Sequence, residues 1–386
     1  MQFPYKHSAA DTTIFTVMSA LAAQHQAINL SQGFPDFPID PQLAGLLSEA
    51  AYGNFNQYAP MQGLPVLREA IAIDFAKRYA VKVDPIQEIT ITPGATYGIY
   101  TAFASFLKNN DEVIVLEPAY DSYIPNIEMH GAKAIPVALN YPDFSVDWMK
   151  VKNTITSKTK AIIINTPHNP TGAVWSREDW NILAEIIKDT EIIILSDEVY
   201  EQLVFDGQKH YSVLQHEELR QRSFAIFSFG KVFNNTGWKL GYIIAPKNMT
   251  NIFRHVHQYV CFSVNTPAQY AVAKYLEKQQ LPDVTTMMEH KRNLFLELMD
   301  KSPFTILQKT SGSYFQLAGY EKISDLPDVE FAKWLTEKHG VATIPLSPFY
   351  SSKKDDKLVR FCFAKKEETL KRAAEKLLQL NKKTTI

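Results

Sequence analysis

Two lysines stand in a part of the sequence where lysine is chemically unusual. Lys231 follows an apolar run at residues 225–228 and a glycine, and Lys239 lies eight residues later, close to glycine and ahead of another apolar run. Lysine is seldom buried without a role, and burial lowers its pKa toward that of a nucleophilic amine. The alternative is that both are surface lysines whose methylene chains lie over apolar neighbours, and it fits the sequence less well. We therefore expect a chemically active amine at Lys231.

An acid and a tyrosine follow a different apolar run, residues 192–196. Asp197 and Tyr200 lie three residues apart, so both side chains could point into one site. A buried carboxylate there would need a positive partner, because burial without one is costly. Alternatively, Asp197 caps a helix and Tyr200 packs in the core. The two residues alone leave both interpretations open.

Two further loops begin where apolar runs end. Residues 93–96 (Pro-Gly-Ala-Thr) contain a glycine that would let a ligand approach the backbone, and a helix that starts there would offer free N–H groups to a phosphate. Taken alone, this stretch is better interpreted as a plain helix cap. Residues 166–172 contain two prolines and a glycine, which make a rigid loop that would hold Asn169 in a fixed orientation. We expect His168, in the same loop, to be structural.

The elements that would position these residues are short apolar strands separated by helices. Continuous apolar character, without alternation, is typical of strands buried on both faces of a mainly parallel sheet. Amphipathic segments fill the gaps, so the sequence predicts a doubly wound α/β fold over about residues 45–280. Ligands of such sheets bind beyond the carboxyl ends of the strands, where the residues above lie. The expected strands are 89–92, 112–116, 133–139, 161–165, 192–196, 225–228 and 241–245.

The alternation of apolar strands and amphipathic helices ends at about residue 285. A charged helix at 287–301, scattered short strands and a terminal helix at 367–380 indicate an α+β region. A prior of roughly 100–200 residues per domain suggests two domains. We expect a large domain at residues 45–284 and a small, discontinuous domain formed by residues 1–44 and 285–386.

Composition and charge argue against several classes of function. The 386 residues are 46% hydrophobic and include 40 basic and 41 acidic residues, for a net charge of −1. Binding to nucleic acid or to an anionic membrane would call for a concentrated basic face, so we expect neither. Cys261 and Cys362 have no metal-like spacing, and we expect neither a disulfide nor a metal site. The first eight residues lack the apolar core of a signal peptide, so a cytoplasmic location is the default expectation.

Four motifs together resemble the class I aminotransferases, enzymes of the pyridoxal 5′-phosphate (PLP) fold type I. The motifs are residues 165–172 (Asn-Thr-Pro-His-Asn-Pro-Thr-Gly), 196–200 (Ser-Asp-Glu-Val-Tyr), 228–231 (Ser-Phe-Gly-Lys) and 237–241 (Gly-Trp-Lys-Leu-Gly). The likeness extends from residues 31–36 to residues 360–364, hence over nearly the whole chain. Residues 257–268 make the chain most similar to bacterial methionine aminotransferases and to the kynurenine/glutamine aminotransferases.

The resemblance implies a PLP site with catalytic roles for three residues. Lys231 would bind PLP covalently and then carry the substrate's α-proton. Asp197 would pair with the pyridine nitrogen and keep it protonated. Tyr200, together with Asn169, would hydrogen-bond the phenolate oxygen of the ring. The implied cofactor-binding residues are Ala95, Thr96, Tyr120, Asn169, Asp197, Tyr200, Ser228, Lys231, Lys239 and Tyr58.

For three of these cofactor-binding residues the resemblance implies a specific role. Tyr120 matches the aromatic residue that stacks on the cofactor ring. Tyr58 matches a tyrosine that reaches the phosphate of the neighbouring subunit, which implies a homodimer with shared active sites. Lys239 stands where many family members have arginine, so a point charge would replace a bidentate contact to the phosphate.

The resemblance also implies how an amino acid and a 2-oxo acid would bind. Arg360 matches the arginine that grips the α-carboxylate as a bidentate fork, and Gly33 would add a backbone N–H. Asn169 would also contact the substrate. An aromatic lining by Phe15, Phe34 and Phe262 would favour methionine first and aromatic or kynurenine-type amino acids second. Each ring could equally be ordinary core packing.

Two alternatives share these residues. A cysteine-S-conjugate β-lyase would use the same PLP site and differ only in whether a leaving group stands on the substrate's Cβ. A non-catalytic aminotransferase-like binding module would carry an added DNA-binding domain, for which the sequence leaves no room before the aminotransferase-like region. A PLP-dependent aminotransferase that works by a ping-pong mechanism is therefore the favoured interpretation.

Overall fold

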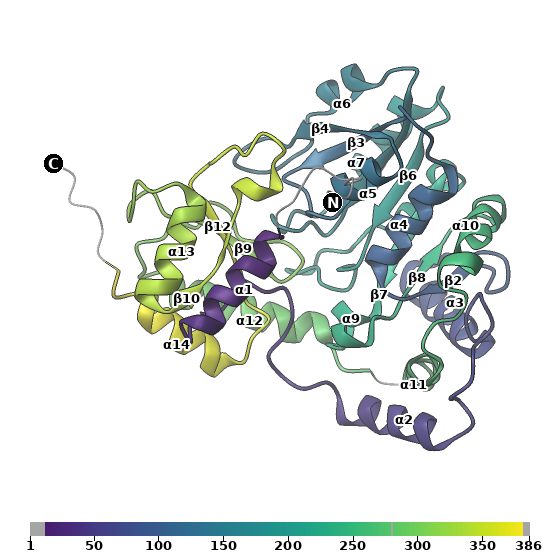
Figure 1. The fold of residues 1–386 in the computed structure, drawn as a ribbon, viewed down its shortest axis with the longest axis horizontal. Helices are drawn as coiled ribbons and strands as arrows, with labels where there is room; N and C mark the ends of the chain where they lie inside the picture. Colours follow the sequence, from purple (N-terminus) through teal and green to yellow (C-terminus); the bar gives the residue numbers. More distant parts are fainter. Residues whose placement is uncertain (1–11, 279–280, 381–386) are drawn as a thin grey trace, which may run out of the picture.

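The computed structural model describes residues 12–278 and 281–380 as two sheet-containing regions that lie side by side (Figure 1). The first eight residues, on which the expectation of a missing signal peptide depends, lie outside the described residues. Within the described ranges, no helix combines the length and the apolar character needed to cross a bilayer.

A large central sheet contains seven strands within the described residues, in the order β2-β8-β7-β6-β5-β3-β4. Only β8 runs antiparallel to its neighbours, β2 and β7. All seven coincide with the strands expected from the apolar runs, so the prediction of a mainly parallel sheet is confirmed. The strands are β2 Ile89–Thr92, β3 Glu112–Glu117, β4 Lys133–Ala138, β5 Thr159–Asn165, β6 Ile193–Asp197, β7 Ser223–Ser228 and β8 Gly241–Ile244.

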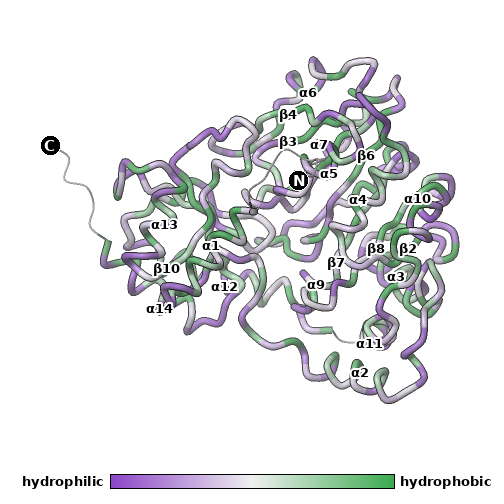
Figure 2. The backbone as a smooth tube through the Cα atoms, in the orientation of Figure 1, coloured by the Kyte–Doolittle hydropathy of each residue, from purple (hydrophilic) through white to green (hydrophobic). Residues whose placement is uncertain are grey.

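Helices cover both faces of this sheet, as expected for a doubly wound fold. Successive residues of a strand point to opposite faces; thus Val113 and Val115 pack with helices of one face, whereas Ile114 and Leu116 pack with those of the other. The first face carries α4 Ala95–Phe106, α5 Tyr123–Met129 and α10 Lys247–Val260. The second carries α3 Pro65–Tyr79, α6 Trp148–Thr154, α7 Arg177–Ile187 and α11 Thr266–Leu276, with α2 Pro41–Tyr52 outside α11. Hydrophobic residues predominate in the strands between the two layers (Figure 2).

The second region joins the two ends of the chain. Strand β1 (Ile28–Asn29) pairs in parallel with β10 (Val341–Ala342), so the N-terminal segment packs with the C-terminal one. Beside them lies an antiparallel sheet in the order β11-β12-β9. Its strands and the surrounding helices are β9 Phe315–Gly319, β11 Ile344–Pro345, β12 Leu358–Cys362, α1 Ile14–Gln24, α12 Val284–Met299, α13 Asp328–His339 and α14 Glu367–Leu377.

Short helical turns complete the chain, and two of them follow strands of the central sheet. Helix α9 (Phe229–Val232) begins directly after β7, and a 3-10 turn at Thr236–Trp238 precedes β8. The remaining turns are α8 Glu217–Arg220, Val213–Gln215 and Ser347–Phe349. The polar residues that follow β2, β5, β6 and β7 therefore meet at one edge of the sheet, the edge that faces the second region.

Candidate active site

A cavity of about 540 Å³ lies at the carboxyl ends of the central strands. This volume lies within the range of small-molecule and cofactor sites. Residues from both regions line it, because α1, the loop before α2, β9 and β12 contribute as well as the central sheet. The residues expected at the site that line the cavity are Phe15, Gly33, Ala95, Thr96, Tyr120, Asn169, Asp197, Tyr200, Ser228, Lys231, Lys239 and Arg360.

Lys231 brings its amine into the cavity from α9. Its Nζ donates a hydrogen bond of 3.3 Å to the carbonyl oxygen of Gly33, and the rings of Tyr200 and Tyr314 lie 5.7 and 5.8 Å away. Burial lowers the pKa of Lys231 to about 8, although the nearby charge of Asp197 opposes this effect. With this pKa, about a tenth of the amine is neutral at pH 7, far more than for an ordinary lysine, and the neutral form is the nucleophile.

Asp197 is the last residue of β6, and its carboxylate is held by two donors. The hydroxyl of Tyr123 donates to Oδ2 at 2.6 Å, and the backbone N–H of Val199 donates to Oδ1 at 3.4 Å. Burial raises the pKa of Asp197 to about 6, while the hydrogen bond from Tyr123 opposes the rise. The sequence left open whether Asp197 and Tyr200 share a site or serve as a helix cap and a core residue. In the structure both line the cavity.

The turn before α4 forms a cradle for an anion. Gly94 has a positive φ of 85°, and no side chain caps the first turn of α4, so its N–H groups remain available. A Cβ added to Gly94 would lie 3.3 Å from Lys239 Nζ, and one added to Gly241 would lie 3.3 Å from the nitrogen of Ala95. Backbone and lysine thus approach so closely that side chains would fill the cradle. Gly94 is the N-cap of α4, as residues 93–96 alone suggested, and the nearby Lys239 adds a cation to this cap.

This set of groups fits PLP. A phosphate would find N–H groups, a hydroxyl and an ammonium group at the cradle, a pyridine nitrogen would find a carboxylate at Asp197, and an aldehyde would find the amine of Lys231. The ring of Tyr120 lines the same cavity. The donors and acceptors of the cavity therefore match the parts of this cofactor one by one.

Arg360 is buried on β12 and has spare hydrogen-bonding capacity. Its Nη1 donates to Asn169 Oδ1 at 2.7 Å and its Nη2 donates to the carbonyl oxygen of Ser31 at 2.7 Å, whereas its buried Nε has no partner among the described residues. The guanidinium carbon lies 3.8 Å from the ring centroid of Phe315. Burial lowers the pKa of Arg360 to about 10, so the group remains charged at neutral pH. A buried cation with a free donor is suited to bind a carboxylate.

The loop after β5 holds Asn169 in place. The Asn165 side chain accepts a hydrogen bond of 2.8 Å from the backbone N–H of Asn169. His168 forms a 2.7 Å contact with Thr171 Oγ1, and burial lowers its pKa to about 4. His168 does not line the main cavity, which agrees with the structural role expected for it.

Three expected site residues do not line the cavity of this chain. Tyr58, Phe262 and Phe34 are 82%, 50% and 46% exposed, respectively. The rings of Tyr58 and Phe262 pack against each other with centroids 5.5 Å apart, and the ring of Phe34 lies 5.1 Å from Lys365 Nζ. Tyr58 was expected to serve a neighbouring subunit, and its exposure is compatible with that. The roles of all three residues stay predictions.

Several residues that line the cavity were missed in the sequence. They include Tyr123, the first residue of α5, whose backbone N–H donates to the carbonyl oxygen of Tyr120 at 3.1 Å, and Phe315, which lies under Arg360. Asp121 and Ser122 adjoin Tyr120, and their polar character next to an expected stacking ring was the available signal. Phe315 stands in a strand whose partner is known only from the fold, so no local signal pointed to it.

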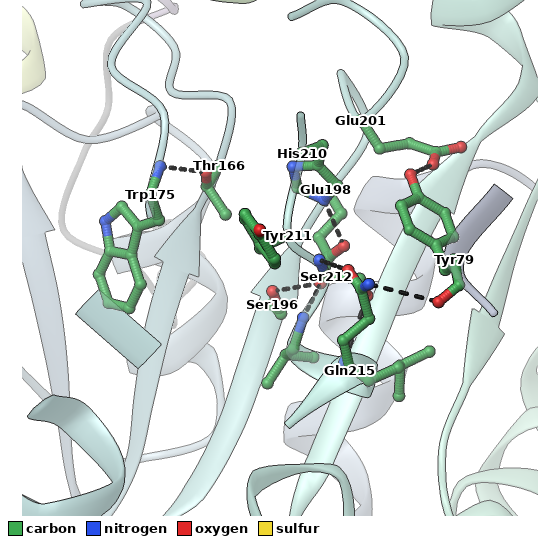
Figure 3. A network of polar contacts seen from close by, with 12 residues as sticks. Tyr79, Thr166, Trp175, Ser196, Glu198, Glu201, His210, Tyr211, Ser212 and Gln215 are labelled. Carbon is green, nitrogen blue, oxygen red and sulfur yellow. Dashed lines mark hydrogen bonds and ion pairs between the residues drawn. The ribbon is translucent and has the colours of Figure 1, made fainter. Parts of the chain in front are cut away.

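Behind the cavity, a buried polar network anchors the segment that carries Asp197 and Tyr200 (Figure 3). Glu198 is fully buried and accepts hydrogen bonds from Ser196 Oγ at 2.8 Å and from the backbone N–H of Val213 at 3.1 Å. His210 Nε2 lies 2.7 Å from its other carboxylate oxygen. Within the segment, Ser196 and Glu198 thus belong to the network, whereas Asp197, Val199 and Tyr200 line the cavity.

The chain is similar in sequence and in structure to known aminotransferases. The family model described as aminotransferase class I and II matches residues 25–377. The chain is 47% identical to methionine aminotransferase of Escherichia coli K12, with 96% of each chain covered, and 33% identical to human kynurenine–oxoglutarate transaminase 1, with 92% and 93% covered. A solved E. coli structure identified as a methionine aminotransferase superposes with a TM-score of 0.94 at 46% identity and covers 98% of this chain and 100% of its own.

Proposed function

The chain belongs to the family of class I and II aminotransferases, PLP-dependent enzymes of fold type I, and we propose that it uses methionine as its preferred amino donor. Aromatic and kynurenine-type amino acids are the second choice, and a 2-oxo acid receives the amino group in a ping-pong reaction. The observation that carries this proposal is the convergence of the Lys231 amine, the Asp197 carboxylate and the Arg360 guanidinium on one cavity. The E. coli methionine aminotransferase, at 47% identity, supports the choice of donor.

Lys231 is the proposed catalytic base and acid. PLP, when bound, supplies an aldehyde carbon that bonds to amines and a pyridine ring that accepts electrons from the substrate's Cα. The Lys231 amine would hold the cofactor in the resting enzyme and then remove and return the proton at the substrate's Cα. Its pKa, lowered to about 8 by burial, suits an amine that must both accept and release a proton.

Asp197, Asn169 and Tyr200 are proposed to hold the ring. The carboxylate of Asp197 would accept a hydrogen bond from the protonated pyridine nitrogen, which keeps the nitrogen charged. Tyr200 and Asn169 would donate hydrogen bonds to the ring's phenolate oxygen. Because burial raises the pKa of Tyr200 strongly, its hydroxyl keeps its proton and remains a donor.

The remaining cofactor contacts follow from the cradle. The backbone N–H groups of Ala95 and Thr96, the hydroxyl of Ser228 and the ammonium group of Lys239 would hold the phosphate. Tyr120 would stack on the ring. We propose that Tyr58 of a second copy completes the phosphate site in a homodimer with shared active sites, and that Phe262 and Phe34 contribute to the substrate pockets.

One part of the cavity would bind the α-carboxylate of the substrate, and another would select its side chain. Arg360, with the backbone N–H of Gly33, would bind the α-carboxylate that all candidate substrates share. Phe15 and Tyr120, whose ring centroids lie 6.4 Å apart, would line the pocket for the side chain. An apolar pocket of this kind favours a thioether or an aromatic ring over a charged side chain.

We further propose the arrangement in which this chemistry takes place. Residues 45–284 would form the large PLP-binding domain, with residues 1–44 and 285–386 as the small domain. The pairing of β1 with β10 supports this division. A cytoplasmic location is proposed on the composition and on the kinship with bacterial enzymes.

A visible absorption spectrum of the purified, PLP-loaded protein tests the function directly. We expect a band of the bound cofactor that falls when methionine is added and returns with a 2-oxo acid. A band that ignores methionine but responds to phenylalanine or kynurenine would change the donor and keep the reaction. A protein that takes up no PLP would contradict the proposed function.

A further inference from the structure

The wall of the cavity carries a carboxylate to which no role has been given. Asp121 follows Tyr120 in the loop between β3 and α5 and lines the cavity. It is half-buried, and its carboxylate forms an ion pair with none of the described residues. Burial raises the pKa of Asp121 to about 6, and the nearby charge of Arg360 opposes the rise. In the proposed function Arg360 also binds the substrate's α-carboxylate. A partly desolvated carboxylate that must share this cation costs free energy, so its retention in a ligand cavity calls for an explanation.

The charge of Asp121 is felt by the groups that would bind substrate. Burial raises the pKa of Tyr120 to about 12, and Asp121 is the charge that contributes most to the same rise. Burial lowers the pKa of Arg360 to about 10, and Asp121 is among the groups that oppose this fall. Asp121 therefore acts on the space between the expected stacking ring and the expected carboxylate grip.

The cations of the cavity leave none to neutralise a second carboxylate of a substrate. Among the described residues that line it, only Lys231, Lys239 and Arg360 are cationic. In the proposed function Lys239 serves the phosphate, Lys231 the proton transfer and Arg360 the α-carboxylate. A distal carboxylate would meet the negative charge of Asp121 without a counter-charge from this chain.

The residues next to Asp121 suit an uncharged side chain. Ser122 also lines the cavity, and its buried Oγ has no hydrogen-bond partner among the described residues. Phe15 lies nearby, with its ring 6.4 Å from that of Tyr120. This part of the wall thus combines apolar rings, a free hydroxyl and a negative charge. Thioether, aromatic and hydrogen-bond-donor groups are compatible with it, whereas a carboxylate is not.

We propose that Asp121 is a specificity-determining residue that excludes amino acids and 2-oxo acids with a second carboxylate. The inference rests on the proposed aminotransferase function, since it names the substrate class of the same cavity. It implies that the amino acceptor is a monocarboxylic 2-oxo acid and that 2-oxoglutarate is a poor one. This separates the chain from the relatives whose names include oxoglutarate.

Steady-state kinetics of the PLP-loaded enzyme test the inference. The variant Asp121→Asn keeps the shape of the side chain and removes its charge. The matched control, Asp189→Asn, removes a charge from the exposed turn that follows α7. For each protein, kcat/KM is measured with methionine and with glutamate, and with 4-methylthio-2-oxobutyrate and with 2-oxoglutarate. Repulsion between two charges in a partly screened cavity predicts that Asp121→Asn raises the glutamate-to-methionine ratio by up to about tenfold at pH 7, where Asp121 could otherwise take up a proton at a similar cost.

The outcomes separate the two proposals. Equal use of both oxo acids by the unaltered enzyme, or a ratio that Asp121→Asn and Asp189→Asn leave alike, would overturn the role of Asp121 while the aminotransferase function stands. Absence of transamination with every amino acid would refute the proposed function instead.

Binding to the unaltered PLP-loaded enzyme gives a second measurement that needs no variant to fold. Glutarate and its monoamide, glutaramate, match in size and differ in one charge, because glutaramate has an uncharged amide in place of one of the two carboxylates. Calorimetry should give a Kd about tenfold lower for glutaramate. Equal dissociation constants would overturn the inference.

Discussion

Tyr123 donates a hydrogen bond of 2.6 Å to Oδ2 of Asp197 across 74 residues of sequence. Both side chains are buried, and the ring of Tyr123 also packs edge-on against Tyr120 at 5.6 Å. One tyrosine thus touches the carboxylate proposed to hold the pyridine nitrogen and the ring proposed to stack on the cofactor. Its position makes it a positioning residue for both.

Replacing Tyr123 by phenylalanine should raise the pKa of Asp197 above its present value of about 6. The hydrogen bond now favours the charged carboxylate, so its loss favours the protonated form, and the acid limb of the kcat profile should move to higher pH. We expect kcat near pH 7 to fall about tenfold while KM changes little. Tyr275→Phe is the control, since it removes an equally short tyrosine–aspartate hydrogen bond, to Asp40. Identical pH profiles for the two variants would contradict the role of Tyr123.

Arg360→Lys should impair substrate binding and spare cofactor retention. The change keeps the charge but removes the planar fork that donates to Asn169 and to Ser31, and it removes the stacking on Phe315. We expect KM for methionine to rise at least about tenfold. Retention of PLP during dialysis, followed by absorbance, should match that of the unaltered enzyme. A variant that loses PLP and keeps its KM would place Arg360 at the cofactor instead.

Glu198→Ala should destabilise the fold through the network behind the cavity. The substitution leaves Ser196 Oγ and the N–H of Val213 without an acceptor and removes the partner of His210 (Figure 3). Removing one partner of a buried polar cluster costs about 3 kcal/mol. The midpoint of urea unfolding measures the loss. Glu185→Ala, which removes an exposed carboxylate from α7, should leave the midpoint unchanged.

Much of the fold could be predicted because the relevant signals are local. The run Ile193–Asp197 is continuously apolar up to its last two residues because it is buried on both faces of the sheet. The carboxyl ends of such strands meet at one edge, so Asp197, Asn169 and Lys231 could be expected to lie together. The strand pattern alone thus indicated where the cavity would be.

The contacts that complete the cavity could not be predicted in the same way. Tyr123 and Asp197 meet only because β3 and β6 lie in one sheet, and nothing in the sequence near Tyr123 marks its hydroxyl as a donor to Asp197. The lining by Phe315 depends on how the second region packs on the first. In the sequence, residues 93–96 look like an ordinary helix cap. The cation beside this cap, Lys239, is distant in sequence and lies next to Gly94 because β2 pairs with β8.

The pKa of Lys231 gives a prediction for the protein before PLP is bound. Only the neutral amine attacks an aldehyde, and burial lowers the pKa of Lys231 from 10.5 to about 8. Covalent capture of PLP by the cofactor-free protein should therefore accelerate as the pH rises through about 8 and level off above it. An ordinary lysine would keep gaining reactivity up to about pH 10.

Stopped-flow absorbance between pH 6.5 and 9.5 would measure this capture. Lys239→Ala should bind PLP more weakly but keep the midpoint, because Lys239 is proposed to hold the phosphate and its charge is a minor influence on the pKa of Lys231. Lys231→Ala should show no covalent capture and no turnover, with its circular dichroism unchanged. A capture rate that still rises steeply at pH 9.5 would show that Lys231 is not desolvated as the cavity requires.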